Sequence, residues 1–157
     1  MNRLEAWLLH ISNITVIATG LLYAYMHYLM KPADPFSVVN HPWEPYMLKM
    51  HIVGAPFLIV GIGLIVHSHI LFKLNNGARS GRKTGIGLIP IFVIMALSGY
   101  FLQTFSDPFV HKAMVITHLS SGAIWFLFYI IHQLSAIKVK RTMTNGAALR
   151  RTLQNNA

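Results

Sequence analysis

The chain has 157 residues, of which 54% are hydrophobic and 11% are charged. Soluble domains carry about 25% charged residues, so the composition excludes a disordered chain and disfavours an ordinary cytosolic domain. Lys and Arg number 13 against 4 Asp and Glu, for a formal net charge of +9. Cysteine is absent, which excludes disulfides, thiolate metal sites, iron–sulfur ligation and covalent c-type haem attachment through this chain.

Four apolar segments follow one another along the chain, at about residues 4–30, 46–74, 85–105 and 109–139. Each reaches the roughly 20 residues that a helix needs to cross a bilayer core. Helices satisfy their own backbone groups in lipid, and no strand-like alternation competes with them. We therefore predict an all-α, integral membrane four-helix bundle over residues 1–141, followed by a polar tail, short helix or coil, at 142–157.

Residues that are typical of helix ends separate these segments. Residues 31–35 contain two prolines and stop the first helix, and Pro45 suits the first turn of the second. Asn and Gly at 75–77 end the second helix. Asp107 is a predicted N-cap that precedes Pro108 at the first position of the fourth helix.

Basic residues gather at one end of the predicted spans. Ten of the thirteen lie there, namely Arg3, Lys73, Arg79, Arg82, Lys83, Lys138, Lys140, Arg141, Arg150 and Arg151. The positive-inside rule then places both termini in the cytoplasm. This asymmetry accounts for the net charge without a nucleic-acid partner, and the basic face is suited to anionic lipid.

Histidine, in contrast to acidic residues, enters the spans. The positions are His10 and His27 in the first, His51, His67 and His69 in the second, and His111, His118 and His132 in the fourth, with His41 in the outer loop. Ionisable residues within a bilayer are costly and usually functional. Neutral imidazole is the commonest metal ligand, so histidines at matching depths are candidate pairs of ligands.

Two histidines of the fourth helix define two stacked sites. His118 and His132 are fourteen residues apart, which is about 21 Å along a helix and within about 40° of one face. Matching depth predicts the pair His51 and His118 for an outer site and the pair His10 and His132 for an inner site. His27 competes for the outer position and His67 for the inner one.

Small residues beside these histidines have two interpretations. Gly54 follows His51 by three residues, and Gly122 follows His118 by four, so each shares a helix face with its histidine. One interpretation is clearance for a flat macrocycle. The other is that small residues let membrane helices approach each other closely.

This pattern, over residues 4–140, resembles the four-helix dihaem b-type cytochrome subunits of formate dehydrogenases and nickel–iron hydrogenases. The resemblance implies two haems b, with His10 and His132 on the inner iron and His51 and His118 on the outer iron. It also implies electron transfer between membrane quinone and an extracytoplasmic redox partner. The chain departs from the family in being shorter and in carrying additional membrane histidines.

The remaining expectations concern partners. His67 and His69, with Ser12 and Asn13, form a predicted quinone pocket at the inner end, and the alternative for the two histidines is interfacial anchoring. The expected partner is a multihaem c-type cytochrome or an iron–sulfur or molybdenum module. The chain is then an electron-transfer subunit, rather than a stand-alone enzyme, in a prokaryotic cytoplasmic (inner) membrane.

A rival function uses thioether and imidazole ligands. Methionines gather near His27 and His51 at the outer ends of the first two spans, at Met26, Met30, Met47 and Met50. These ligand types suit copper(I), so a haem-free copper-handling or metal-transport protein is the alternative. A haem-free membrane anchor is a third hypothesis, but an anchor has no reason to place histidines at equal depths.

Overall fold

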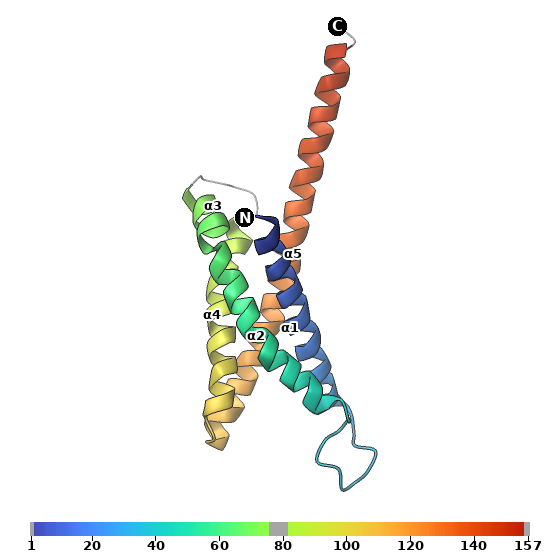
Figure 1. Ribbon diagram of the computed structural model, residues 1–157, viewed down its shortest axis with the longest axis vertical. Helices are drawn as coiled ribbons and strands as arrows, with labels where there is room; N and C mark the ends of the chain where they lie inside the picture. Colours follow the sequence, from blue (N-terminus) through green and yellow to red (C-terminus); the bar gives the residue numbers. More distant parts are fainter. Residues whose placement is uncertain (1, 76–81, 156–157) are drawn as a thin grey trace. The chain divides into compact units, whose positions relative to one another are not determined.

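The computed structural model describes residues 2–75 and 82–155, and within these two ranges it contains helices and no strand (Figure 1). The elements are α1 (Arg3–Leu29), α2 (Glu44–Ile65), the π-helix η1 (Val66–Leu71), α3 (Phe72–Asn75), α4 (Arg82–Thr104) and α5 (Pro108–Asn155). Most of the predicted break at 75–77, and Arg79 of the basic turn, lie outside the described residues.

Among the residues that the structure describes, four helical stretches are long and apolar enough to cross a membrane, namely Arg3–Leu29, Glu44–Asn75, Arg82–Thr104 and Pro108–Gly146. The prediction of an all-α chain with four such helices is therefore confirmed. The distribution of side chains fits lipid surroundings, because large apolar residues such as Phe57 and Leu127 are exposed. Polar residues, in contrast, are buried at Ser12, Asn13, Thr19, Ser98 and Ser121.

Helix ends follow from local hydrogen bonding. Asn2 caps α1, since its Oδ1 accepts from the amide of Glu5 at 2.7 Å while the Glu5 carboxylate accepts from the amide of Asn2 at 2.9 Å. Pro45 lies in the first turn of α2, where no intrahelical N–H bond is lost. Asp107 Oδ1 accepts from the amide of Val110 at 2.9 Å, which confirms the predicted cap of α5.

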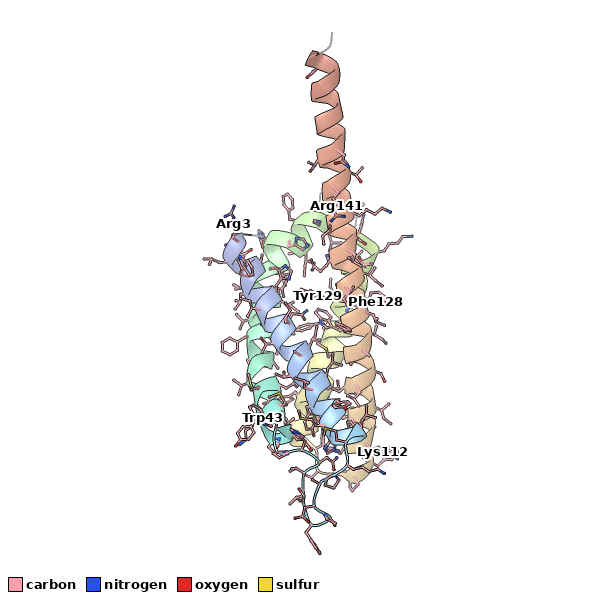
Figure 2. The ribbon with its side chains drawn as sticks, turned by 90° about the vertical axis from the view of Figure 1, so that its right-hand side faces the viewer. Arg3, Trp43, Lys112, Phe128, Tyr129 and Arg141 are labelled. Atoms are coloured by element: carbon pink, nitrogen blue, oxygen red, sulfur yellow. The ribbon has the colours of Figure 1, made fainter. Side chains whose placement is uncertain are left out.

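The chain divides into two compact units, Met1–Phe72 and Lys73–Ala157. In the first unit α1 packs against α2, and Figure 2 shows Arg3 and Trp43 at opposite ends of this hairpin. In the second unit α4 packs against α5, with the rings of Phe92 and Trp125 at 5.4 Å between centroids. The residues predicted to form one domain, 1–141, thus fall in both units.

The last helix is longer than its predicted span. The sequence predicts a crossing over residues 109–139 and a short helix or coil afterwards, whereas α5 continues without a break to Asn155 (Figure 1). Neither proline nor a strong helix-stop signal interrupts residues 140–155, and Gly146 alone is tolerated inside a helix. The basic residues that follow the apolar span therefore continue on the same helix as His118 and His132.

Candidate functional site

His51, on α2, is held against α1 by a carbonyl and a glycine. Its Nδ1 lies 2.9 Å from the carbonyl oxygen of Val16. A Cβ atom added to Gly20 would lie 2.8 Å from His51 Cε1 and 2.9 Å from Nδ1. Only glycine leaves room for the imidazole at this point, so the ring fits where α1 has no side chain.

His118, on α5, is held against α4 in the same way. Its Nδ1 lies 3.0 Å from the carbonyl oxygen of Met95, with Ser98 Oγ at 3.4 Å. An added Cβ on Gly99 would lie 2.9 Å from His118 Cε1 and 3.1 Å from Nδ1. In both units the accepting carbonyl stands four residues before the glycine, so the same arrangement of carbonyl, glycine and imidazole occurs twice.

This arrangement determines which ring nitrogen can bind a metal. A carbonyl oxygen only accepts hydrogen bonds, so Nδ1 of His51 and of His118 must carry the hydrogen. In the neutral imidazole the lone pair then lies on Nε2, which is the tautomer that a metal-ligating histidine needs. Metal-binding histidines typically donate their second nitrogen to a carbonyl or carboxylate, which fixes the ring orientation.

His132 lies fourteen residues after His118 on the same face of α5 and has a related environment. Its Nδ1 is 3.1 Å from Thr84 Oγ1, and an added Cβ on Gly85 would lie 3.4 Å from its Cε1. Thr84-Gly85 and Ser98-Gly99 are fourteen residues apart on α4, as His132 and His118 are on α5. Each hydroxyl–glycine pair of α4 therefore lies next to one of the two histidines of the antiparallel helix α5.

The remaining residues of the predicted haem sites lie in the same helices. His10 is half-buried on α1. The predicted pairs, His10 with His132 and His51 with His118, each take one histidine from each unit and stay predictions. An added Cβ on Gly54 would lie 3.2 Å from Val16 Cγ2, so this glycine allows α1 and α2 to approach closely. Gly122 has open space in front of it, with no atom within 4 Å of an added Cβ.

Two shallow apolar grooves lie side by side on the α1–α2 unit. One, of about 340 Å³, is lined by Thr15, Lys49, Met50, Val53, Gly54 and Phe57. The other, of about 230 Å³, is lined by Leu8, Ile11, Ser12, Thr15, Gly54 and Phe57. Of the predicted quinone contacts, Ser12 therefore lines a groove, although its hydroxyl donates to the Leu8 carbonyl at 2.7 Å. Asn13 is fully buried.

The other predicted quinone contacts, His67 and His69, lie in the π-helix η1. His67 is exposed and His69 is half-buried. Between them, Ser68 Oγ donates to the Glu5 carboxylate on α1 at 2.9 Å. The structure thus joins the first turn of α1 to the histidine pair through Ser68 and adds Glu5 to this end of the unit.

His27 belongs to a separate polar cluster at the other end of this unit. Its Nδ1 lies 2.7 Å from Oε1 of the buried Glu44, whose Oε2 accepts from the amide of Asn40 at 2.9 Å. The ring of Tyr23 stacks on the imidazole at 5.3 Å, and Tyr28 meets it edge-on at 4.6 Å. This cluster holds the loop between α1 and α2 in place. The environment of His27 therefore differs from that of His51 and His118, whose rings pack over a glycine of the facing helix.

Two other histidines take part in helix and loop ends. His41 Nδ1 accepts from the amide of Trp43 at 3.1 Å, and the His111 amide donates to Asp107 at the start of α5. Within residues 2–75 and 82–155, no group of three or more His, Asp or Glu side chains is placed to hold a metal ion. Bis-histidine ligation of a haem iron requires only two.

Several of these residues are absent from the sequence-based prediction, above all Gly20, Gly85, Gly99 and Glu5. A signal for two of them is present, because the pairs Thr84-Gly85 and Ser98-Gly99 repeat with the spacing of the histidines.

No protein-family model, curated protein or solved structure matches this chain.

Proposed function

We propose that this protein is a dihaem b-type cytochrome that carries electrons across a membrane between quinone and an extracytoplasmic redox partner. His51 and His118 are the proposed ligands of an outer haem, and His10 and His132 those of an inner haem. The fold in this proposal is a four-helix bundle with both termini in the cytoplasm. The proposed location is the inner membrane of a prokaryote.

The observation that carries the proposal is the repeated carbonyl–glycine–imidazole arrangement. His51 and His118, paired from sequence by depth alone, have the same hydrogen-bond acceptor at the same offset from a ring-seating glycine. A histidine that only filled space would not need a preset tautomer or a glycine beneath its ring. Two histidines with identical support suit two ligands of one metal centre.

The histidine environments also fit the donor set of a b-type haem. Neutral imidazole with its Nδ1 hydrogen committed offers Nε2 as the ligand atom, and cysteine is absent from the chain. The haem, when bound, supplies one-electron redox chemistry. The chain's own residues orient the imidazoles, and the apolar helices exclude water and so raise the energetic cost of charge at the site.

The spacing along α5 suits passage across a bilayer. His118 and His132 lie on one helix at about 21 Å separation, most of the thickness of the hydrocarbon core of about 30 Å. In this proposal the inner histidine lies on the side of the quinone pocket of His67 and His69. The outer histidine faces a redox partner, a multihaem c-type cytochrome or an iron–sulfur or molybdenum module.

An absorbance spectrum of the purified chain tests this function directly. We expect a reduced b-type α band, two non-covalent haems per chain that organic solvent extracts, and a low-spin bis-histidine signal. Metal analysis of the same sample distinguishes iron from the copper of the alternative function. A colourless protein, or one that holds copper and no haem, would refute the proposal.

Ligand assignments are tested one histidine at a time. His118→Ala and His132→Ala should each reduce the haem content from two to one per chain, because each removes one axial ligand. His111→Ala, on the same helix, is the matched control and should keep both haems. Retention of two haems in either ligand variant would contradict the assignment of that histidine.

A further inference from the structure

The π-helix η1 is the irregular element of the first unit, and it contains both histidines of the proposed quinone pocket. Residues Val66–Leu71 adopt it directly after the regular helix α2. A π-helix hydrogen-bonds over five residues instead of four, is rare, and is frequently found at functional sites. Because neither glycine nor proline lies in this segment, its sequence shows no simple breaker that accounts for the irregularity.

One hydrogen bond joins this π-helix to the first turn of α1. Ser68 Oγ donates to Glu5 Oε2 at 2.9 Å, across 63 positions of sequence. The Asn2 amide also donates to Glu5 Oε2 at 2.9 Å, and Asn2 Nδ2 donates to Oε1 at 3.2 Å. The carboxylate is therefore held in one place while its side chain stays partly exposed to water.

The position of Glu5 among the charges of the chain is unusual. The four acidic residues are Glu5, Asp34, Glu44 and Asp107. In the predicted orientation the last three lie at the outer ends of the spans, and Glu5 lies at the inner end with ten of the thirteen basic residues. Among the four acidic side chains, Glu5 is the one that this orientation places on that side.

We propose that Glu5 is the proton-exchanging carboxylate of the inner quinone pocket and that it acts through Ser68. This inference rests on the proposed function. Reduction of a quinone takes up two electrons and two protons, and two haems, when bound, would supply one electron each. Each proton passes from water to Glu5 and then to the Ser68 oxygen, which releases its own hydrogen toward the quinone oxygen. Quinol oxidation runs along the same route in reverse.

The side chains have the bonding capacity that this route requires. A hydroxyl donates one hydrogen bond and accepts two, so Ser68 can accept from a protonated Glu5 while it donates to the next acceptor. His67 and His69 flank Ser68 in η1 and are suited to bind a quinone carbonyl. Glu5 thus connects the pocket to water, whereas the histidines would bind the substrate.

The test compares variants that separate proton exchange from helix capping. Glu5→Gln keeps the shape and an acceptor for Ser68 but cannot take up a proton, and Ser68→Ala removes the hydroxyl. Ser68→Thr retains a hydroxyl and should behave like the native chain. Glu5→Gln also keeps the capping box, because glutamine at this position can accept from the Asn2 amide, so the thermal unfolding of this variant in detergent is the control for a structural role.

The probe is menadiol, a soluble naphthoquinol, mixed with the oxidised full-length protein in detergent. For Glu5→Gln and Ser68→Ala we expect kcat for haem reduction to fall about 100-fold or more with KM unchanged, the range for loss of a positioned proton-transfer group. Added acetate should restore part of the rate in Glu5→Gln. A carboxyl band in the redox-induced infrared difference spectrum of the native protein should disappear in the same variant.

The outcomes distinguish this inference from the function on which it rests. Absence of haem, or no reduction of the native protein by menadiol, would overturn the proposed function. If the native protein is reduced and Glu5→Gln matches it in rate and infrared spectrum, only the role of Glu5 fails. If the slower reduction of Glu5→Gln comes with a lowered unfolding temperature or with loss of haem, Glu5 is a capping residue and the inference is wrong.

Discussion

Gly99 offers the sharpest test of how the outer histidine is held. A Cβ added there would lie 2.9 Å from His118 Cε1, whereas ordinary van der Waals contacts of a Cβ lie at 3.4–4 Å. In Gly99→Ala the imidazole must therefore move by about half an ångström or more. Movement of the ring draws Nδ1 away from the Met95 carbonyl, which it now contacts at 3.0 Å.

The change in stability expected for Gly99→Ala is the balance of opposing contributions. Overpacking of this kind costs about 1–3 kcal/mol, and a disturbed hydrogen bond costs about 0.5–1.5 kcal/mol. Alanine in place of glycine within a helix stabilises the helix by roughly 0.5–1 kcal/mol. The imidazole, rather than the backbone, moves to make room for the methyl group. We therefore expect the fold to be retained and the position of His118 as a ligand to be disturbed. Loss of a supporting contact typically weakens metal affinity 10–100-fold.

The assay is the haem content of purified Gly99→Ala, together with the low-spin signal and the redox titration of each haem. Gly146→Ala is the control in the same unit, because no atom lies within 4 Å of its added Cβ and the residue lies outside the predicted haem sites. We expect the control to keep two haems and the variant to lose one or to bind it at least tenfold more weakly. Two haems with unchanged signals and potentials in Gly99→Ala would refute the reasoning.

The remaining predictions concern the two ends of the first unit. His67→Ala and His69→Ala should each lower turnover with quinol while both haems are retained, and unchanged turnover would move the quinone site elsewhere. Glu44→Ala should lower the free energy of unfolding by about 1.5–3 kcal/mol, because His27 and Asn40 lose the buried carboxylate to which they bond. Thermal unfolding in detergent measures this change, and loss of a haem from the same variant would assign His27 a role in ligation.

Much of the helical framework could be predicted because it depends on local properties of the chain. An apolar run of bilayer length must be helical in lipid, and the capping chemistry at Asp107 and Pro45 needs only neighbouring residues. The extent of α5 was harder to predict, because a polar sequence after Arg141 without glycine-rich or proline-rich breaks is compatible with either helix or coil.

The sequence by itself determined the number of spanning helices, the positions of the histidines along them and their spacing on α5. Only the tertiary structure decided which nitrogen of each imidazole is engaged, because this depends on the helix that faces it. Val16 and Gly20 meet His51 from another helix, as Met95 and Gly99 meet His118. The contact of Ser68 with Glu5 is likewise a product of packing between distant segments, which no local pattern of residues encodes.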